Sequence, residues 1–212
     1  MTPLVIIPAR MGGSRFPGRP LHKLPNGKPL VLAMLETLSE RYPTYVASAD
    51  DAVADAVPAA QFIRTTDAFA NGTERVAHAA HIVDPAGRYA WVANVQGEFA
   101  RLPGQMALEI HRDDDLVVTY ATTLPDKPTP DHVRVVAAGR RAVFFTRAAV
   151  PDARMHLGIY VFRRPVLDLY AGTPECALER AERLEQMRLL HLGIPITLRE
   201  HDCDGAVVLH RP

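Results

Sequence analysis

Several common signatures are missing from this sequence of 212 residues, and each absence excludes a class of protein. It has only two cysteines, Cys176 and Cys203, without CxxC spacing, so neither a disulfide framework nor a zinc site is expected. Lys plus Arg and Asp plus Glu number 24 each, so no net charge favours a nucleic acid or a membrane surface as partner. No apolar run approaches transmembrane length, and the N-terminal residues lack the pattern of a signal peptide. We therefore expect a cytoplasmic protein without a nucleic-acid or membrane partner.

The two best-known phosphate-binding motifs are also absent. The sequence contains neither GxxxxGK[ST] nor GxGxxG. It is therefore predicted to be neither a P-loop enzyme nor a protein with the Rossmann fingerprint.

Short apolar runs alternate with helical patterns along the first half of the chain. Strands are predicted at 4–7, 44–49, 61–64, 89–96 and 115–123, and helices at 29–42, 50–60, 72–83 and near 104–111. This alternation is typical of α/β proteins with a largely parallel sheet. We predict an α/β fold, a three-layer sandwich built on a mainly parallel sheet.

The pattern changes after Pro128 and Pro130. Two β-rich runs flank Gly139, which is typical of a hairpin. The elements predicted here are a hairpin over 132–147, a strand at 156–164, a long helix at 177–193 and strands at 195–200 and 205–210. We expect a single domain over residues 1–212, with a hairpin-rich insertion at about 125–165.

The most informative stretch is the one that follows the first predicted strand. Residues 8–19 contain two adjacent glycines, two prolines and three arginines. Gly12 and Gly13 would let backbone amides turn inward and form an anion site, beyond a strand end where α/β proteins bind ligands. Three guanidinium groups, whose planar forks match phosphate oxygens, add fixed positive charge: Arg10, Arg15 and Arg19. Polyphosphate binding is the favoured interpretation, and pairing of the arginines with surface carboxylates is the alternative.

At IIPARMGGSRFPGRPL the chain resembles the sugar-acid cytidylyltransferases, most closely those that act on 3-deoxy-manno-octulosonate. Six further stretches resemble motifs of that family in the same order: NGKPL, NGTERVA, NVQG, VRVV…AVFFTRAAVP, HLGIYVFRR and LERAERLEQMRLLHLGIPI. The resemblance covers nearly the whole chain. It implies a nucleotidyltransferase with a fold like that of nucleotide-diphospho-sugar transferases, which couples CTP to a sugar acid and gives a CMP-sugar and pyrophosphate.

The resemblance also implies which residues form the site. Implied nucleotide-binding residues are Pro8, Ala9, Arg10, Gly12, Gly13, Ser14, Arg15, Arg19, Gly72, Thr73 and Arg75. Implied substrate-binding residues are Gln96, Gly97, Arg134, Arg147, His156 and Gln186, with the two arginines facing the carboxylate. For His156, a purely structural role is an equal alternative. Implied catalytic residues are Arg10, Arg19 and Glu98, which would position the reactants and stabilise charge while the anomeric hydroxyl attacks the α-phosphorus.

The implied cofactor is Mg²⁺, with Mn²⁺ as the alternative, and the implied assembly is a homodimer. The sequence departs from the family pattern at the metal site. Glu98 stands where the family has Asp. Its extra methylene displaces the carboxylate oxygen that would bind Mg²⁺, an ion that demands near-ideal octahedral geometry. Candidates for the second ligand are Asp202, Asp204 and His210, the last standing where the family has Asp.

Two interpretations of function stay open, and a third is more remote. In the first, the chain is a working cytidylyltransferase with Glu98 as its principal metal ligand. In the second, it is a catalytically impaired relative that binds a nucleotide or a protein partner. The third is a metal-dependent glycosyltransferase that uses RDDDL at 112–116, although a solvated acidic turn is the favoured interpretation of that run.

Overall fold

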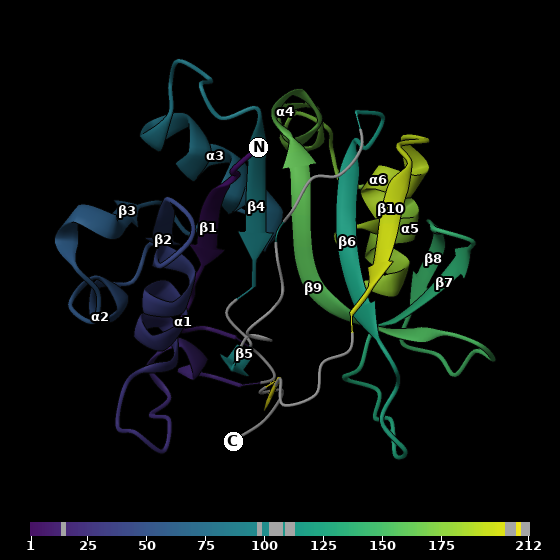
Figure 1. Cartoon of the computed structure of the whole chain (residues 1–212), viewed down its shortest axis with the longest axis horizontal. Coiled ribbons are helices and arrows are strands. Elements are labelled where there is room, and N and C mark those ends of the chain that lie inside the picture. Colours follow the sequence, from purple (N-terminus) through teal and green to yellow (C-terminus); the bar gives the residue numbers. More distant parts are fainter. Residues whose placement is uncertain (14–15, 97–98, 102–107, 109–112, 202–206, 209–212) are drawn as a thin grey trace.

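One large mixed sheet runs through the molecule (Figure 1). The computed structural model describes residues 1–13, 16–96, 99–101, 108, 113–201 and 207–208. Within these residues, nine strands follow the order β3-β2-β1-β4-β9-β6-β10-β8-β7. They are β1 (Leu4–Pro8), β2 (Thr44–Ser48), β3 (Phe62–Arg64), β4 (Trp91–Val95), β6 (Val117–Thr122), β7 (Arg134–Ala138), β8 (Arg141–Thr146), β9 (Arg154–Arg163) and β10 (Ile196–Glu200). Two short strands, β5 (Phe99–Arg101) and β11 (Val207–Val208), pair with each other.

Helices pack against both faces of this sheet. They are α1 (Leu30–Ser39), α2 (Asp51–Ala54), α3 (Gly72–Val83), α4 (Arg164–Ala171), α5 (Ala177–Glu182) and α6 (Met187–His191), with 3₁₀ turns η1 (Arg19–Leu21) and η2 (Ala59–Gln61). Among the described residues, none of these helices is long and apolar enough to cross a membrane.

The first strand shows how the two faces are built. All of Leu4 to Ile7 is buried, as expected for a strand covered on both sides. Val5 and Ile7 belong to one core with residues of α1, whereas Leu4 and Ile6 belong to a second core with residues of α3, α4 and α6. Because side chains alternate along a strand, one apolar run supplies both cores.

The predicted α/β fold is confirmed, but the prediction of a mainly parallel sheet is wrong for β7, β8 and β9, whereas β10 is parallel to β6. β1 is parallel to β2 and β4, and β2 is parallel to β3, as the alternation indicated. β9 is antiparallel to both β4 and β6, and β8 is antiparallel to β10 and β7. The physical reason is the connection: after the hairpin the chain re-enters the sheet directly, without the helical crossover that parallel pairing requires.

The segment at about 125–165, expected to be an insertion, is continuous with the sheet. β7 and β8 form the predicted hairpin, which turns at Gly139 with a φ of 58°. β9, however, lies between β4 and β6 near the middle of the sheet. Figure 1 shows it as the long curved strand next to β4.

Two predicted helices differ from the observed ones, and a third falls almost wholly outside the described residues. The pattern over 50–60 yields only α2 and the turn η2, separated at Pro58. The long helix expected at 177–193 is divided into α5 and α6, because Arg183 has left-handed backbone angles. The helix expected near 104–111 lies outside the described residues, apart from Leu108. One helix, α4, was not predicted; it follows β9 directly and has Pro165 in its first turn.

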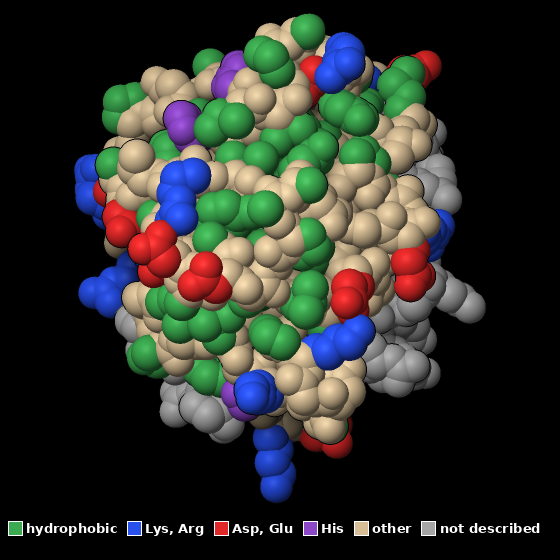
Figure 2. Space-filling view, turned by 90° about the vertical axis from the view of Figure 1, so that its left-hand side faces the viewer, with side chains coloured by type: hydrophobic (Ala, Val, Ile, Leu, Met, Phe, Trp, Pro, Cys, Tyr) green, Lys and Arg blue, Asp and Glu red, His purple; other side chains and the backbone are tan. Residues whose placement is uncertain are grey.

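The exposed edge of the sheet at β3 is short and charged. Arg64 pairs with Asp51 at 2.8 Å, and its guanidinium lies over the ring of Phe62 at 5.0 Å from the centroid. On this side of the molecule, Figure 2 shows acidic and basic side chains interspersed with apolar ones. A three-residue edge strand with a charged side chain resists pairing with another sheet.

Candidate active site

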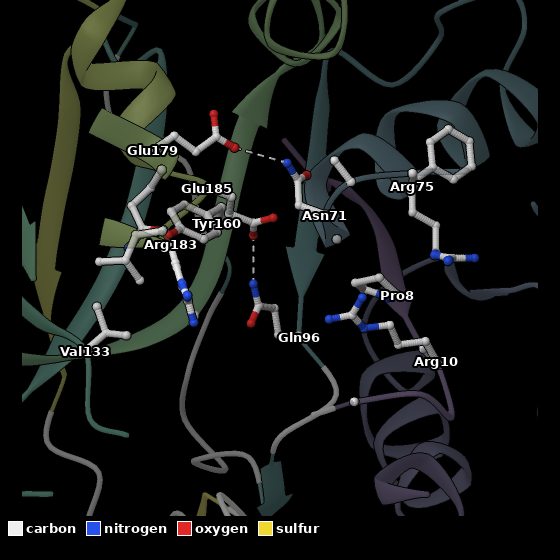
Figure 3. Close-up of a pocket in the computed structure, with 18 of the residues that line it drawn as sticks. Pro8, Arg10, Asn71, Arg75, Gln96, Val133, Tyr160, Glu179, Arg183 and Glu185 are labelled. Carbon is white, nitrogen blue, oxygen red and sulfur yellow. Dashed lines mark hydrogen bonds between the residues drawn. The ribbon is translucent and has the colours of Figure 1, made fainter. Parts of the chain in front are cut away.

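A cavity of about 410 Å³ lies where β1 and β4 end and β9 crosses beside them (Figure 3). Its first wall comes from the loop after β1 and the start of α3, with Pro8, Ala9, Arg10, Gly13, Arg19, Gly72 and Arg75. Its second wall comes from β9 and the segment that joins α5 to α6, with His156, Gly158, Tyr160, Arg183, Glu185 and Gln186. Gln96, just after β4, lies between them. Three arginines line each wall, Arg10, Arg19 and Arg75 on the first and Arg147, Arg180 and Arg183 on the second, and only the second adds the phenol of Tyr160 and several carboxylates.

The loop after β1 is held in place by contacts with the end of β2. The amide of Ala9 donates to the carbonyl of Ala47 at 2.9 Å, and the amide of Met11 donates to Oδ2 of Asp50 at 2.9 Å. Farther on, the amide of Gly18 returns to the carbonyl of Met11 at 2.9 Å. These bonds fix the backbone from which Arg10 projects.

The predicted reason for the paired glycines needs a correction. Neither Gly12 nor Gly13 has a positive φ, so neither needs glycine for a left-handed backbone. A Cβ on Gly12 would meet no heavy atom within 4 Å, and Gly12 is not part of the cavity lining. Among the described residues of this loop, the left-handed one is Gly18, with a φ of 74° at the start of η1. Gly13 lines the cavity, and Ser14 and Arg15 lie outside the described residues.

Arg75 brings a largely buried positive charge to the first wall. It is 5 % exposed, its Nη1 donates to Oγ1 of Thr65, and its Nη2 lies 3.8 Å from Oδ1 of Asp67. Burial lowers the pKa of Arg75, and the positive charge of Arg10 lowers it further, while Asp67 and Asp50 oppose both effects. An anion bound between Arg10 and Arg75 would offset this cost, so the wall favours a strongly negative ligand.

The start of α3 is anchored to the opposite wall. Oδ1 of Asn71 caps the helix by accepting from the amide of Glu74 at 3.0 Å. Nδ2 of Asn71 donates to the hydroxyl of Tyr170 at 2.9 Å and to Oε1 of Glu179 at 3.3 Å. A Cβ on Gly72 would meet Cγ of Pro8 at 3.4 Å, an ordinary van der Waals distance, so the helix start lies close against the end of β1. The positive end of the α3 dipole therefore lies at the cavity.

Glu185 links the two walls at the base of the cavity. Its Oε2 accepts from the amide of Thr73 at 3.2 Å, and its Oε1 accepts from Nε2 of Gln96 at 2.8 Å (Figure 3). Burial raises the pKa of Glu185, and the hydrogen bonds from Thr73 and Gln96 oppose that rise. Because its amide donates to Glu185, Gln96 is held in a fixed orientation.

Tyr160 offers a hydroxyl group to which the described part of the chain gives no partner. Its side chain is 1 % exposed and lines the cavity, and no described residue hydrogen-bonds to its hydroxyl oxygen. Burial raises the pKa of Tyr160, and the negative charge of Glu185 adds to the rise. The phenol is therefore a neutral donor that can serve a ligand hydroxyl or oxygen.

His156 lines the cavity, but both of its ring nitrogens are used internally. Nδ1 accepts from the amide of Gly158 at 3.3 Å, and Nε2 lies 2.9 Å from Oγ1 of Thr119. Since Oγ1 of Thr119 itself donates to the carbonyl of Ile159 at 2.7 Å, it accepts the proton of Nε2. Burial lowers the pKa of His156 to about 3, so the imidazole is neutral. These contacts favour the structural role that was the alternative for this residue.

Two arginines expected at the substrate carboxylate are held by backbone carbonyls. Arg134 is 5 % exposed, and its Nη1 donates to the carbonyls of His132 and Arg147 at 3.2 and 2.7 Å. It does not line the cavity, which corrects its expected position. Arg147 does line it, but its Nη1 donates to the carbonyls of Glu182 and Arg183 at 3.1 and 3.4 Å.

Most of the remaining predicted residues fall into three groups. Those on the cavity lining are Pro8, Ala9, Arg10, Gly13, Arg19, Gly72, Arg75, Gln96, Arg147, His156 and Gln186. Thr73 lies behind the lining, where its Oγ1 accepts from Nδ2 of Asn94 at 2.9 Å. Residues outside the described part of the chain are Ser14, Arg15, Gly97, Glu98, Asp202, Asp204 and His210. The roles of all these residues stay predictions.

Several cavity residues were missed from the sequence, chiefly Asn71, Tyr160, Arg183 and Glu185. A signal for Tyr160 was present: His156, Gly158 and Tyr160 alternate along β9 and face the same side. Glu185 directly precedes Gln186, which was predicted. It was missed because an unbroken helix over 177–193 would not turn two adjacent side chains toward one cavity.

The described residues do not by themselves form a metal site. Among them, no group of three or more His, Cys, Asp and Glu side chains is arranged to hold a metal ion. The expected ligands Glu98, Asp202, Asp204 and His210 lie outside this part of the chain.

The acidic run at 112–116 is part of the fold. Asp115 is 4 % exposed, accepts from Oγ1 of Thr197 at 2.5 Å and lies 3.1 Å from Nη2 of Arg199. The carbonyl of Asp113 accepts from Nη2 of Arg163. None of the described residues of this run lines the cavity. These contacts contradict the glycosyltransferase hypothesis, and at Asp115 they also contradict the expected solvated turn.

Comparison with known proteins gives a consistent family. Residues 4–125 match a family model described as Cytidylyltransferase. The 3-deoxy-manno-octulosonate cytidylyltransferase of Rhodospirillum centenum is 35 % identical and aligns over 92 % of this chain and 84 % of its own length. That of Rhodospirillum rubrum is also 35 % identical, over 92 % of this chain and 87 % of its own.

Solved structures agree with this result. A CMP:2-keto-3-deoxy-manno-octonic acid synthetase complexed with CTP is 31 % identical, with a TM-score of 0.83 over 98 % of this chain and 93 % of that one. The inositol-1-phosphate CTP transferase of T. maritima, 12 % identical with a TM-score of 0.66 over 100 % of this chain and 90 % of that one, shows the fold alone. The chain belongs to the cytidylyltransferase family.

Proposed function

We propose that this chain transfers the cytidylyl group of CTP to a sugar acid like 3-deoxy-manno-octulosonate and releases pyrophosphate. The observation that carries the proposal is the single cavity with two unlike walls. One wall presents arginines and the start of α3, as a triphosphate requires. The other presents neutral donors, carboxylate acceptors and the arginines Arg147, Arg180 and Arg183, as a polyhydroxylated acid requires. Two of the relatives named above are 3-deoxy-manno-octulosonate cytidylyltransferases by name.

In this proposal the triphosphate lies along the arginine wall. Arg10, Arg19 and Arg75 neutralise its charge and hold the leaving pyrophosphate as negative charge develops on it. Because the guanidinium groups are fixed to a hydrogen-bonded loop and to a helix, little reorganisation is needed during the reaction. Their contribution is orientation and charge stabilisation.

The sugar acid lies against the second wall. The Tyr160 hydroxyl donates to it, and the carboxylate of Glu185 accepts from its hydroxyl groups. Gln96, held by Glu185, lies between the two substrates and orients the attacking hydroxyl toward the α-phosphorus. The arrangement therefore brings the attacking hydroxyl close to the α-phosphorus and in line with the leaving pyrophosphate.

We also propose Mg²⁺, with Mn²⁺ as the alternative, as the cofactor. The proposal rests on the chemistry of phosphoryl groups and on Glu98, which follows Gln96 closely in the sequence. Asp202, Asp204 and His210 are the candidates for a second ligand. Since these residues lie outside the described part of the chain, no step above is routed through the metal.

Three further expectations belong to this proposal. The packing of helices on both faces of the sheet supports the three-layer arrangement. A homodimer is supported by Val143, which stays 45 % exposed on β8 while Ala142 and Phe145 are buried within the subunit. Light scattering after gel filtration would test the dimer. The cytoplasmic location stays a prediction.

The test is the release of pyrophosphate from CTP with a panel of sugar acids and Mg²⁺ or Mn²⁺. The proposal predicts release that depends on both substrates. If CTP raises the melting temperature but no sugar acid causes release, the chain is the impaired relative. If CTP neither binds nor reacts, the proposal is wrong.

A further inference from the structure

Arg183 is a positive charge on the second wall that has no polar partner among the described residues. Its side chain is exposed and lines the cavity, and Figure 3 shows it on the same wall as Val133, Tyr160 and Glu185. Within the part of the chain that the structure describes, its guanidinium makes no hydrogen bond or ion pair. An arginine in a cavity without an internal partner is available to an anionic ligand.

The four carboxylates of residues 175–185, the segment from which Arg183 projects, each have another partner. Their partners are Arg180 for Glu175, Arg188 for Glu179, Oγ1 of Thr146 for Glu182, and Thr73 with Gln96 for Glu185. The charge of Arg183 is therefore not neutralised by the segment from which it projects.

The backbone of Arg183 is held in an uncommon conformation. It ends α5 with a φ of 54° and a ψ of 43°, in the left-handed region where glycine is usual at a helix end. Nη1 of Arg147 donates to the carbonyls of Glu182 and Arg183 and so fixes this turn from outside. A side chain at a position that favours glycine has a cost to the fold, and here it places a cation on the cavity wall.

We propose that Arg183 binds the carboxylate of the sugar acid, and that Arg147 positions Arg183 through the two carbonyls. This inference rests on the proposed function and adds a substrate-binding residue to it. Two anions must enter one cavity, and they repel each other. With the triphosphate on the arginines of the first wall, a separate cation on the second wall holds the carboxylate apart from it.

The variant Arg183→Gly tests this directly, because glycine removes the charge and suits the left-handed backbone. We expect the KM for the sugar acid to rise about tenfold, as for the loss of a charged hydrogen bond at an exposed site. We expect the KM for CTP to stay within about twofold, and Arg183→Lys to restore part of the loss. The melting temperature should be unchanged or higher.

A matched control separates the backbone effect from the charge. Asp152 has a φ of 55°, lies on an exposed turn and does not line the cavity. Asp152→Gly should match the stability change of Arg183→Gly and leave both KM values as they are. An equal rise in KM in the two variants would overturn the role of the charge.

The ligand group is identified with an analogue of the sugar acid whose carboxyl is reduced to an alcohol. The wild-type chain should prefer the acid over the alcohol, and in Arg183→Gly the ratio of the two kcat/KM values should be about tenfold smaller. If Arg183→Gly keeps the preference of the wild-type chain, the role of Arg183 is wrong. The proposed function would survive that result, because the wild-type chain would still release pyrophosphate. If the wild-type chain releases no pyrophosphate with any sugar acid, the proposed function fails, and this inference fails with it.

Discussion

The two walls of the cavity hold their charges in different ways. On the first wall, positive side chains project from a loop and a helix, and within the described residues Arg10 has no hydrogen bond or ion pair. On the second wall, carboxylates and amides are bound to one another, as Glu185 is to Gln96, and Arg183 lies beside them without a hydrogen bond or ion pair among the described residues. The first arrangement attracts a highly charged ligand, whereas the second recognises hydroxyl groups by position. The following variants test whether the two walls differ in this way.

The largest effect is expected from the removal of Arg188, a buried arginine that joins the two walls behind the cavity. Arg188, 1 % exposed, bonds Glu179 at 2.6 and 2.8 Å and Glu74 at 2.9 Å, and so ties α6 to α5 and α3. Burial alone would lower the pKa of Arg188, but these carboxylates raise it overall. Arg188→Ala leaves buried carboxylates unpaired and should cost about 3–5 kcal/mol in the free energy of unfolding, measured by urea denaturation.

The control for this variant is an exposed ion pair. Arg154 lies 3.2 Å from Glu200, and both side chains are largely in solvent. Arg154→Ala should cost less than about 1 kcal/mol. A similar loss in both variants would show that the buried network does not hold the walls together.

Removal of Arg10 should weaken nucleotide binding while the fold stays intact. Arg10 is exposed on the cavity wall, so Arg10→Ala leaves no buried group unpaired. We expect the affinity for CTP, measured by titration calorimetry, to fall about 10- to 100-fold. Arg140→Ala, on the exposed hairpin turn, is the control and should bind CTP as the wild-type chain does.

The bulge of β9 allows a smaller but sharper test of the second wall. Gly158 has a φ of 66°, where the pairing of β9 with β6 shifts register, and a Cβ there would lie 3.4 Å from Oε1 of Gln96. Gly158→Ala should cost about 1–2 kcal/mol of stability through backbone strain. It should also lower kcat, because relief of the strain at residue 158 moves the backbone of β9 beside Gln96. Gly87→Ala, with a φ of 65° and open space around it, controls for the strain alone. An unchanged kcat would remove Gln96 from the orientation of the substrates.

The smallest expected effect is a change in the pH dependence of stability. Because burial raises the pKa of Glu185 above its usual 4.5, its proton favours the folded chain. The favourable contribution is complete below about pH 4.5 and is lost as the pH rises through the higher folded value. We therefore expect the melting temperature of the wild-type chain, minus that of Glu185→Gln, to be lower at pH 8 than at pH 4. A difference that is constant with pH would contradict the raised pKa.

Local sequence signals predicted the first half of the molecule well. The strand at residues 4–7, the helix at 72–83 and the cavity position of Arg10 all follow from patterns within a few residues of one another. Ligands of such sheets bind beyond the strand ends, so the loop after β1 could be identified without knowledge of distant contacts.

The second half depends on contacts that are distant in sequence. The place of β9 between β4 and β6 is set by pairing with strands about 40 to 70 residues away, which its own pattern does not reveal. The turn at Arg183 depends on Arg147, and the orientation of Glu185 depends on Thr73 and Gln96. The family resemblance identified Gln186 but could not show that the helix before it is broken.

The central claim is that each wall binds its own substrate. The most direct test measures both KM values, for CTP and for the sugar acid, in Arg10→Ala and Arg183→Gly side by side. We predict that Arg10→Ala raises chiefly the KM for CTP and that Arg183→Gly raises chiefly the KM for the sugar acid, each about tenfold. If both variants raise both values equally, the division of the cavity into two walls is wrong.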